Sequence, residues 1–240
     1  MESSKANRRD TMKTIGLLGG MSWIATVPYY TRLNELVAKQ LGDTNSARIL
    51  LYSVNYARLK SLYHHGWNQI PKIFEEEYKR LLDAKPDCII LACNTLHKAF
   101  DIIASSLPDN VPFFHAVHLT RDFCLNSGIK NPLFIGTRFT MNDDYFMLPL
   151  REAGINLTLP TELEQKQVQE VQIEVSKGMI EDRHKVFFAQ LINNYPNVDG
   201  VILACTELPL IAPADSPIRP IINPAELQCQ AAVKFALAKD

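Results

Sequence analysis

Short apolar runs alternate with longer amphipathic stretches along the 240 residues of this chain. The β-branched and aliphatic runs predict strands at residues 14–18, 48–54, 88–92, 111–115, 133–135, 155–159, 200–204 and 221–222. The stretches between them predict helices at residues 26–41, 69–84, 96–106, 117–127, 142–153, 163–178, 181–194 and 224–238. Strands that alternate with helices of about 10–15 residues are typical of an α/β fold with parallel sheets.

One short segment occurs twice in the sequence. Residues 86–95 (PDCIILACNT) and residues 198–207 (VDGVILACTE) share an aspartate and then the same Ile-Leu-Ala-Cys tetrad. The two tetrads end on Cys93 and Cys205, which are separated by nearly half of the chain. This repeat favours two α/β halves related by duplication, each with a cysteine at the end of a strand.

The position of these two cysteines suggests chemistry. In a parallel α/β sheet, ligands bind where strands end and helices begin. Residues 94–95 and 206–207 would lie at the start of a helix. Their backbone N–H groups could hold an anion there and favour the thiolate form of the preceding cysteine. If the two halves face each other, two thiols flank one cleft. Such a pair suits removal of a proton from one face of a carbon next to a carboxylate and delivery of a proton to the other face.

Plainer interpretations of the cysteines stay open. A buried cysteine is often only a small hydrophobic residue at a strand end, although the matched pair favours function. Cys93 could form a nucleophilic dyad with His97, one helical turn later, but no orienting acid is evident. Cys88, Cys124 and Cys229 have no comparable setting, and we expect them to be core or surface thiols.

Two loops that follow predicted strands could also meet a ligand. Residues 16–20 (GLLGG) lack the pattern of a nucleotide-binding loop and better suit a tight turn near a small anion, with Met21 and Ser22 lining the site. Residues 136–141 (GTRFTM) offer hydroxyl groups to a substrate. Their alternative role is a helix N-cap at Thr140 or Asn142.

Composition excludes several classes of protein. The 25 basic and 26 acidic residues leave no excess charge to attract nucleic acid or a membrane surface, and the apolar runs are too short to span a membrane. Five cysteines without a CxxC pair suggest reduced thiols in the cytoplasm. We expect residues 1–12 to be a flexible tail without a signal peptide. The pairs His64–His65 and His115–His118 lack acidic or cysteine partners at ligand spacing, so no metal site is expected.

Four motifs together resemble the aspartate/glutamate racemase family, and in particular its aspartate-racemase-like branch of broad-specificity amino-acid racemases. They are residues 19–23 (GGMSW), 92–98 (ACNTLHK), 136–141 (GTRFTM) and 204–208 (ACTEL), and the likeness runs in order from about residue 12 to about residue 237. The resemblance implies two similar α/β lobes related by a pseudo-twofold axis. The first lobe would comprise residues 13–115 and 217–240, and the second residues 116–216.

The resemblance also implies a reaction and a set of site residues. It indicates a racemase that needs neither pyridoxal phosphate nor another cofactor, with Cys93 and Cys205 exchanging the roles of thiolate base and thiol acid. The substrate, a free amino acid such as aspartate or glutamate, would be held by Met21, Ser22, Asn94, Thr95, Thr137, Thr140, Lys166 and Thr206. A homodimer is expected, because the family usually forms dimers.

Two positions depart from the family pattern. Ile24 and Asn223 stand where the branch usually has carboxylates, which puts substrate preference in question but leaves the cysteines untouched. Two alternatives remain: a related two-cysteine isomerase of the hydantoin racemase or maleate isomerase type, and a binding protein without catalytic activity on the same scaffold.

Overall fold

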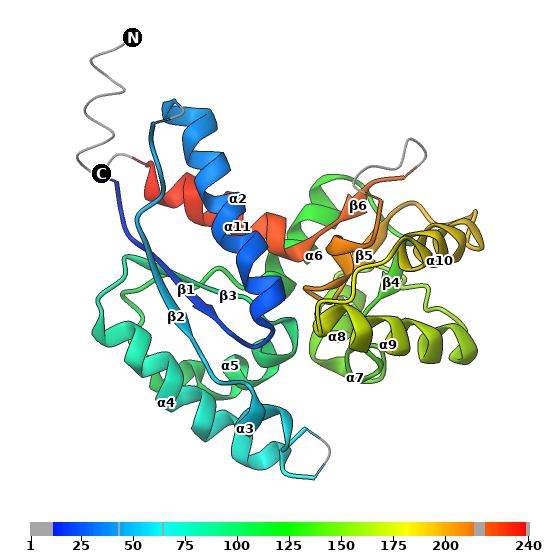
Figure 1. Ribbon diagram of the computed structural model, residues 1–240, viewed down its shortest axis with the longest axis horizontal. Coiled ribbons are helices and arrows are strands. Elements are labelled where there is room, and N and C mark those ends of the chain that lie inside the picture. Colours follow the sequence, from blue (N-terminus) through cyan, green and yellow to red (C-terminus); the bar gives the residue numbers. More distant parts are fainter. Residues whose placement is uncertain (1–11, 43, 64, 214–218, 239–240) are drawn as a thin grey trace. The chain divides into compact units, whose positions relative to one another are not determined.

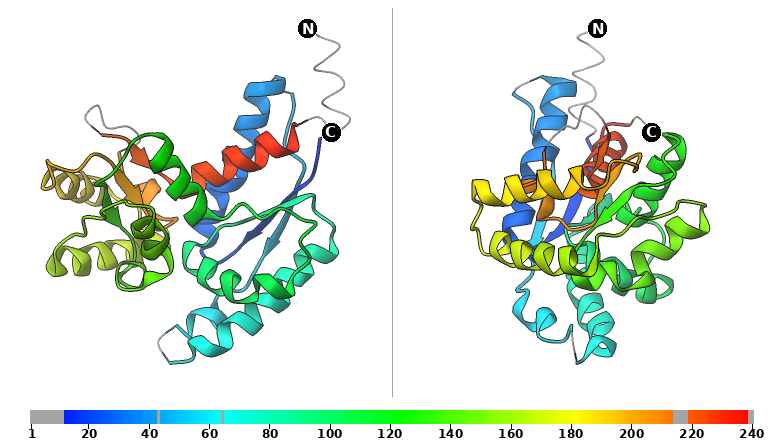
Figure 2. Two further views of the ribbon diagram at one scale, coloured as in Figure 1. Left: turned by 180° about the vertical axis from the view of Figure 1, so that it is seen from behind. Right: turned by 90° about the vertical axis from the view of Figure 1, so that its right-hand side faces the viewer.

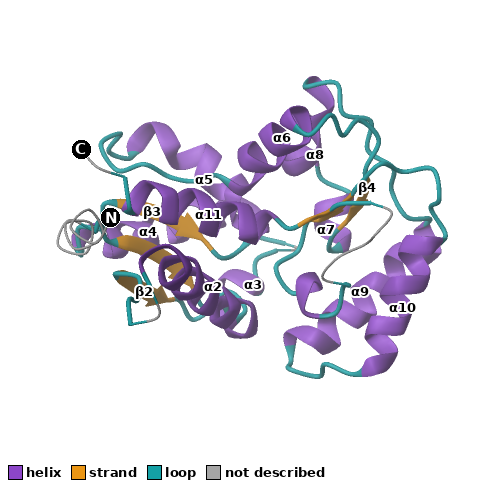
Figure 3. Ribbon diagram, turned by 90° about the horizontal axis from the view of Figure 1, so that it is seen from above, coloured by secondary structure: helices purple, strands orange, loops and turns teal. Residues whose placement is uncertain are grey.

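A computed structural model of the chain describes residues 12–42, 44–63, 65–213 and 219–238. The chain divides into two compact units, the first made of residues up to His115 together with Ala225–Asp240, and the second of Ala116–Pro224. Each unit contains a parallel sheet flanked by helices (Figures 1 and 3). The expectation of an α/β fold with two sheet-containing lobes is therefore confirmed.

The first unit is built on a sheet of order β2-β1-β3, in which all neighbours are parallel. Its strands are β1 (Ile15–Gly19), β2 (Ile49–Ser53) and β3 (Cys88–Leu91), and its helices are α2 (Trp23–Leu41), α3 (Ala57–Lys60), α4 (Ile70–Asp83), α5 (His97–Ile103) and α11 (Pro224–Ala236). Three short 3-10 helices, η1 (Trp67–Gln69), η2 (Asn94–Leu96) and η3 (Ala104–Ser106), join or extend these elements.

Helices cover both faces of this first sheet, which explains why β1 and β3 read as continuous apolar runs. Residues of α2 and α11, such as Leu33 and Val233, pack with Ile90 in one buried cluster. Residues of α4, such as Phe74, pack with Leu91 in a second cluster on the opposite face. Figures 1 and 2 show α2 and α11 together on one side of the strands and α4 on the other.

The second unit has a sheet of order β4-β5-β6, again entirely parallel. Its strands are β4 (Leu133–Ile135), β5 (Val201–Leu203) and β6 (Ile221–Ile222). Its helices are α6 (Ala116–Asn126), α7 (Arg138–Met141), α8 (Asp144–Glu152), α9 (Glu162–Ser176) and α10 (Asp182–Asn193), with the 3-10 helix η4 (Leu208–Leu210) after β5.

The two sheets have the same topology. In the first, β1 pairs with β2 on one side and β3 on the other, and β3 continues outward through a single parallel bridge from Ile89 to Phe113. In the second, β4 pairs with β5, makes a single parallel bridge from Leu133 to Thr158 on its other side, and β5 continues outward to β6. The strands that precede the two repeated cysteines, β3 and β5, are therefore equivalent.

The aspartate of the repeat has the same structural role in both units. The Asp87 carboxylate, just before β3, accepts the backbone N–H of Thr14, just before β1, at 2.6 Å. The Asp199 carboxylate, before β5, accepts the N–H groups of Lys130 at 2.7 Å and Asn131 at 2.9 Å, before β4. Each aspartate ties together the starts of two neighbouring strands, and this contact explains its place in the repeated sequence.

The structure differs from the sequence prediction at several places. Residues 111–115 and 155–159 make single bridges rather than full strands; in the first of these, Pro112 removes a backbone donor that a strand needs. β6 pairs with β5, so Ile221–Ile222 belong to the second sheet, whereas the sequence prediction assigned residues 217–240 to the first lobe. Met12 is buried and its carbonyl accepts from Arg48, so the predicted tail does not reach residue 12; residues 1–11 lie outside the described part.

Candidate active site

Cys93 lies at the carboxyl end of the first sheet. It follows the last residue of β3 by two positions, is buried, and has extended backbone at the start of η2. The neighbouring strand β1 ends at Gly19, so the loop after β1 meets the loop after β3 at the same edge of the sheet. This edge is the usual ligand-binding edge of a parallel sheet.

The side chain of Asn94 is the clearest sign of a ligand in the first unit. It is only 4% exposed, and neither its Oδ1 nor its Nδ2 has a hydrogen-bond partner among the described residues. A buried amide without partners costs on the order of 1–3 kcal/mol. An amide both donates and accepts, so Asn94 suits a ligand that carries an acceptor and a donor, such as a carboxylate and an ammonium group. Thr95, the next residue, is also buried.

The backbone conformation at one position of the loop after β1, Gly20, requires glycine. Gly20 has φ of 88°, and a Cβ atom there would lie 2.4 Å from the backbone nitrogen of Val54. The Thr26 hydroxyl accepts the Gly20 N–H and donates to the Ser22 carbonyl, both at 2.9 Å. Met21 is thereby buried in the same cluster as Cys93.

Ser22 and Ile24 begin the helix that follows this loop. The Ser22 hydroxyl accepts the N–H of Ala25 and caps α2, so Ser22 already has a structural role. Ile24 is partly buried in the first turn.

His97 is fully buried, and both of its ring nitrogens lie near described partners. Its Nδ1 lies 3.1 Å from the carbonyl of Cys93, and since a carbonyl only accepts, Nδ1 carries the proton. Its Nε2 lies 3.4 Å from the amide nitrogen of Gln228, which also donates to the Phe114 carbonyl at 2.8 Å. Tyr29 donates to the oxygen of the same amide at 2.7 Å. These partners of both ring nitrogens weigh against the Cys93–His97 dyad.

Cys205 lies at the equivalent position of the second unit, two residues beyond β5. Its thiol donates to Oε2 of Glu207 at 2.9 Å, and the Thr206 hydroxyl donates to the same oxygen at 3.1 Å. Glu207 is only 6% exposed, so this carboxylate is buried against two donors. Sequence reasoning considered only the backbone of residues 206–207 and missed the side chain of Glu207.

The helix N-termini expected behind the cysteines are weaker than predicted. After β5, the described chain forms only the three-residue η4, and after β3 it forms η2 and then the seven-residue α5. Aligned peptide dipoles need a longer helix to sum to an appreciable charge. Among the described contacts, Cys205 is hydrogen-bonded directly to the carboxylate of Glu207.

Thr137 lies on the loop after β4, which corresponds to the Gly19–Ser22 loop of the first unit, and Thr140 lies in the short helix α7 that follows. Thr137 is the N-cap of α7, and its hydroxyl lies 3.0 Å from that of the buried Thr140. A Cβ atom at Gly136 would lie within 3.1 Å of Thr140 and 3.4 Å of Ala204, so this loop packs beside the residue that precedes Cys205. The alternative of an N-cap at Thr140 or Asn142 was wrong, because Thr137 caps α7 and Asp143 caps α8, the helix that follows.

The other candidate residues lie in ordinary surroundings. Lys166 is exposed on α9, where its ammonium group lies 3.8 Å from Glu162. Burial raises the pKa of Cys88 to about 12 and that of Cys124 to about 11, and it also raises the pKa of Cys229. These three thiols are core residues. Asn223 follows β6 and is partly buried.

The histidines also differ from one another in setting. His115 is buried and its Nε2 lies 3.1 Å from Asp101, an acidic partner that the sequence spacing did not reveal. His65 and His118 are exposed, and His64 lies outside the described residues. Within the described part of the chain, no three His, Cys, Asp or Glu side chains gather closely enough to hold a metal ion. None of the described helices has the length and hydropathy to cross a membrane.

The fold and the site define a two-unit α/β protein with one thiol after the equivalent strand of each unit. Its sequence matches the Asp/Glu/hydantoin racemase family over residues 18–232. The chain therefore belongs to this family.

Three solved structures resemble the chain along nearly its whole length. A candidate Asp/Glu racemase from Yersinia pestis is 30% identical, with a TM-score of 0.79 and coverage of 95% of this chain and 100% of that one. An aspartate racemase homologue from Pyrococcus horikoshii OT3 is 27% identical, with a TM-score of 0.80 and the same coverage. An aspartate racemase from Picrophilus torridus is 27% identical, with a TM-score of 0.78 and coverage of 93% and 94%. The family and these neighbours support an isomerase of the Asp/Glu racemase type.

Proposed function

We propose that the protein racemises a free amino acid at its α-carbon by a two-base mechanism without pyridoxal phosphate or a metal. Cys93 and Cys205 act on opposite faces of the α-carbon, one as thiolate base and the other as thiol acid. The roles are exchanged for the other enantiomer. The observation that carries the proposal is the placement of two thiols at the carboxyl ends of equivalent parallel strands.

The buried amide of Asn94 supports an amino acid as the ligand. Its unpartnered donor and acceptor match the carboxylate and ammonium groups that every amino acid carries. Thr95 and Thr206 follow the two cysteines closely in sequence and are proposed to hold the same groups, together with Met21, Ser22, Thr137 and Thr140. Binding of the α-carboxylate to neutral donors also lowers the cost of negative charge that develops at the α-carbon when its proton leaves.

Glu207 is proposed to be a positioning residue for Cys205. As a carboxylate, it accepts a hydrogen bond from the thiol and so holds Cys205 in the acid form, ready to protonate the carbanion. When Cys205 must act as the base, the thiol proton can pass to Glu207.

The substrate is proposed to be aspartate, glutamate or a related amino acid. The support is the similarity to one aspartate racemase and to a homologue of one, each at 27% identity. Lys166 is proposed to meet a side-chain carboxylate, although its ammonium group lies beside Glu162. We also propose that the protein works in the cytoplasm as a homodimer.

The decisive experiment replaces each cysteine by serine. Cys93→Ser and Cys205→Ser should each abolish inversion of all amino acids in a panel, measured by chiral chromatography in deuterium oxide. Each variant can still exchange the α-proton of one enantiomer, and the two variants should prefer opposite enantiomers. Cys88→Ser is the matched control, because this buried thiol begins β3, the strand that leads to Cys93, and its replacement should affect stability alone.

Four outcomes would contradict the proposal. Full racemisation by either serine variant would refute the two-base mechanism. Inversion of hydantoins or isomerisation of maleate in place of amino-acid racemisation would assign the related isomerase activity. Amino-acid binding by the wild-type protein without deuterium incorporation would indicate a binding protein. Activity that is lost to a chelator and restored by zinc would refute the metal-free mechanism.

A further inference from the structure

The amide of Gln228, on α11, is the centre of a buried hydrogen-bond chain in the first unit. Gln228 is fully buried although its side chain is polar. The Tyr29 hydroxyl donates to its Oε1 at 2.7 Å, so the opposite end of the amide is the nitrogen. That nitrogen donates to the Phe114 carbonyl at 2.8 Å and lies 3.4 Å from Nε2 of His97. An apolar side chain could fill this space without a desolvation cost, so the amide points to a role for its contacts.

The hydrogen-bond chain ends at the backbone of the candidate site. Nε2 of His97 accepts from the amide, and Nδ1 carries the proton. Nδ1 lies 3.1 Å from the carbonyl of Cys93 and 3.2 Å from that of Asn94. The rings of His115 and Phe113 pack against the imidazole, with centroids at 4.5 Å and 5.6 Å. The imidazole therefore holds the turn that carries both the thiol and the buried amide of the site.

We propose that Gln228 is a positioning residue for the Cys93 thiol and acts through His97. The amide fixes the tautomer and the plane of the imidazole, and the imidazole N–H in turn fixes the backbone from which the thiol projects. A base displaced by about 1 Å can lose on the order of 100-fold in rate. The inference rests on the proposed role of Cys93 as one of the two bases, and it adds to the site a residue 131 positions after His97.

The second unit holds its cysteine differently. Pro209 follows Cys205 by four residues, at the position that corresponds to His97 in the repeat. Proline offers no side-chain donor to the backbone of the turn. The Cys205 thiol itself donates to the carboxylate of Glu207. Loss of the amide on α11 should therefore disturb Cys93 and leave the other thiol in place, whereas a general loss of stability would affect both.

Alkylation by iodoacetamide tests the proposal without reference to racemase activity. Cys93 and Cys205 are 6% and 5% exposed, so the reagent reaches either thiol only when the surrounding chain opens. Gln228→Met keeps the length of the side chain but removes its hydrogen bonds. It should speed the labelling of Cys93 about fivefold, the effect of one lost hydrogen bond, and leave the labelling of Cys205 unchanged. Mass spectrometry of the labelled peptides gives both rates from one sample.

Gln230→Met is the matched control for the alkylation. Gln230 is exposed on the same helix, and its amide donates to Glu226 at 2.7 Å. Its replacement makes the same chemical change outside the buried chain of contacts and should leave the labelling of both cysteines as in the wild type. Labelling of Cys93 at the wild-type rate in a folded Gln228→Met protein would overturn the proposal, as would an equal increase at both cysteines.

Deuterium exchange at the α-carbon connects the contact to catalysis. In a Cys205→Ser background, exchange depends on Cys93 alone, and adding Gln228→Met should slow it about tenfold. In a Cys93→Ser background, the same substitution should slow exchange far less. Equal slowing in the two backgrounds would refute a role specific to Cys93. Faster labelling of Cys93 in a protein that racemises no amino acid would support the contact and refute the proposed function, so the two failures are distinguishable.

Two substitutions of His97 cover the case in which Gln228→Met fails to fold. Asparagine keeps an N–H near the position of Nδ1, whereas leucine has no donor. If the bond to the Cys93 carbonyl holds the turn, Cys93 should be labelled about fivefold faster in His97→Leu than in His97→Asn. Equal rates in these two variants would show that the N–H does not position the thiol.

Discussion

Replacement of Glu207 by glutamine would test the contact that the sequence did not reveal. The substitution keeps the shape of the side chain but removes its charge and one acceptor. In the structure, a single oxygen of this buried carboxylate accepts both the Cys205 thiol and the Thr206 hydroxyl. A hydrogen bond to a charged group contributes about 1.5–3 kcal/mol. If that energy is lost from the transition state, kcat/KM should fall about 10- to 100-fold.

The equilibrium between the enantiomers constrains how kcat/KM can change in this variant. The two enantiomers of an amino acid have equal free energy in water, so kcat/KM in the two directions must fall by the same factor. The asymmetry of the site should appear instead in deuterium exchange. If Cys205 delivers protons poorly, deuterium should enter the enantiomer that Cys93 deprotonates faster than that enantiomer is inverted. Chiral chromatography coupled to mass spectrometry separates the two rates.

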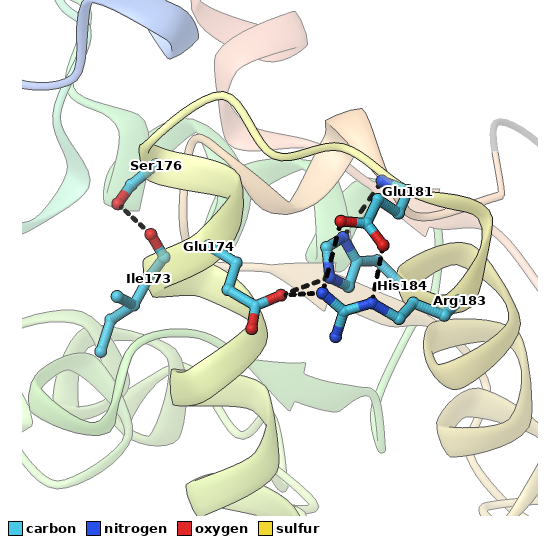
Figure 4. Close-up of polar contacts among 6 residues, drawn as sticks. All are labelled: Ile173, Glu174, Ser176, Glu181, Arg183 and His184. Carbon is cyan, nitrogen blue, oxygen red and sulfur yellow. Dashed lines mark hydrogen bonds and ion pairs between the residues drawn. The ribbon is translucent and has the colours of Figure 1, made fainter.

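A matched control lies in the same unit. Glu174 on α9 accepts from Nε2 of the buried His184 at 2.7 Å and from Arg183 at 2.6 Å (Figure 4). Glu174→Gln makes the same chemical change away from both cysteines and should leave kcat/KM unaltered. A folded Glu207→Gln protein whose kcat/KM stays within twofold of the wild type would refute the role proposed for Glu207.

Three further predictions concern stability and specificity. Gly20→Ala should destabilise the protein by roughly 3 kcal/mol in urea unfolding, because a left-handed backbone and a contact with Val54 both oppose a Cβ atom; an unchanged midpoint would contradict this. The pKa of Glu174 is lowered by its hydrogen bond from His184, so the stabilisation is complete above about pH 4.5 and is lost as the pH falls below it. The difference in unfolding free energy between wild type and Glu174→Gln should therefore be largest near pH 7 and vanish in acid. A difference that does not change with pH would contradict a stabilising role for the Glu174 carboxylate. Asn223→Asp should change the order in which amino acids are racemised, and an unaltered order over a full panel would place residue 223 outside the site.

The sequence predicted the elements with the most regular patterns. β1 and β3 are covered on both faces, so their apolar runs are continuous, and α4 has the spacing of a helix with one buried side. The segments at 111–115 and 155–159 also have the sequence pattern of strands, but each forms only a single bridge. Strand pairing depends on neighbouring segments that the local pattern does not contain.

The chemistry of the candidate site was less accessible to sequence. The repeated tetrad identified Cys93 and Cys205, because their residue type and position could be read directly. That the amide of Asn94 has no partner depends on the whole surrounding structure. The contact of Glu207 with Cys205 depends on the turn that follows β5, which bends the chain so that residues two apart meet. An acid two positions after a repeated cysteine was the one available signal.

The division of the chain sets an order for its folding during synthesis. The first unit is discontinuous, since α11 supplies Val233 to its core and Gln228 to the buried contacts of Tyr29 and His97. A ribosome that has made residues 1–223 has therefore not yet made the helix that completes this core. The second unit is contiguous and can fold as soon as β6 emerges. The first unit is thus begun before the second but completed after it. The surroundings of Cys93 are not complete until α11 has been synthesised.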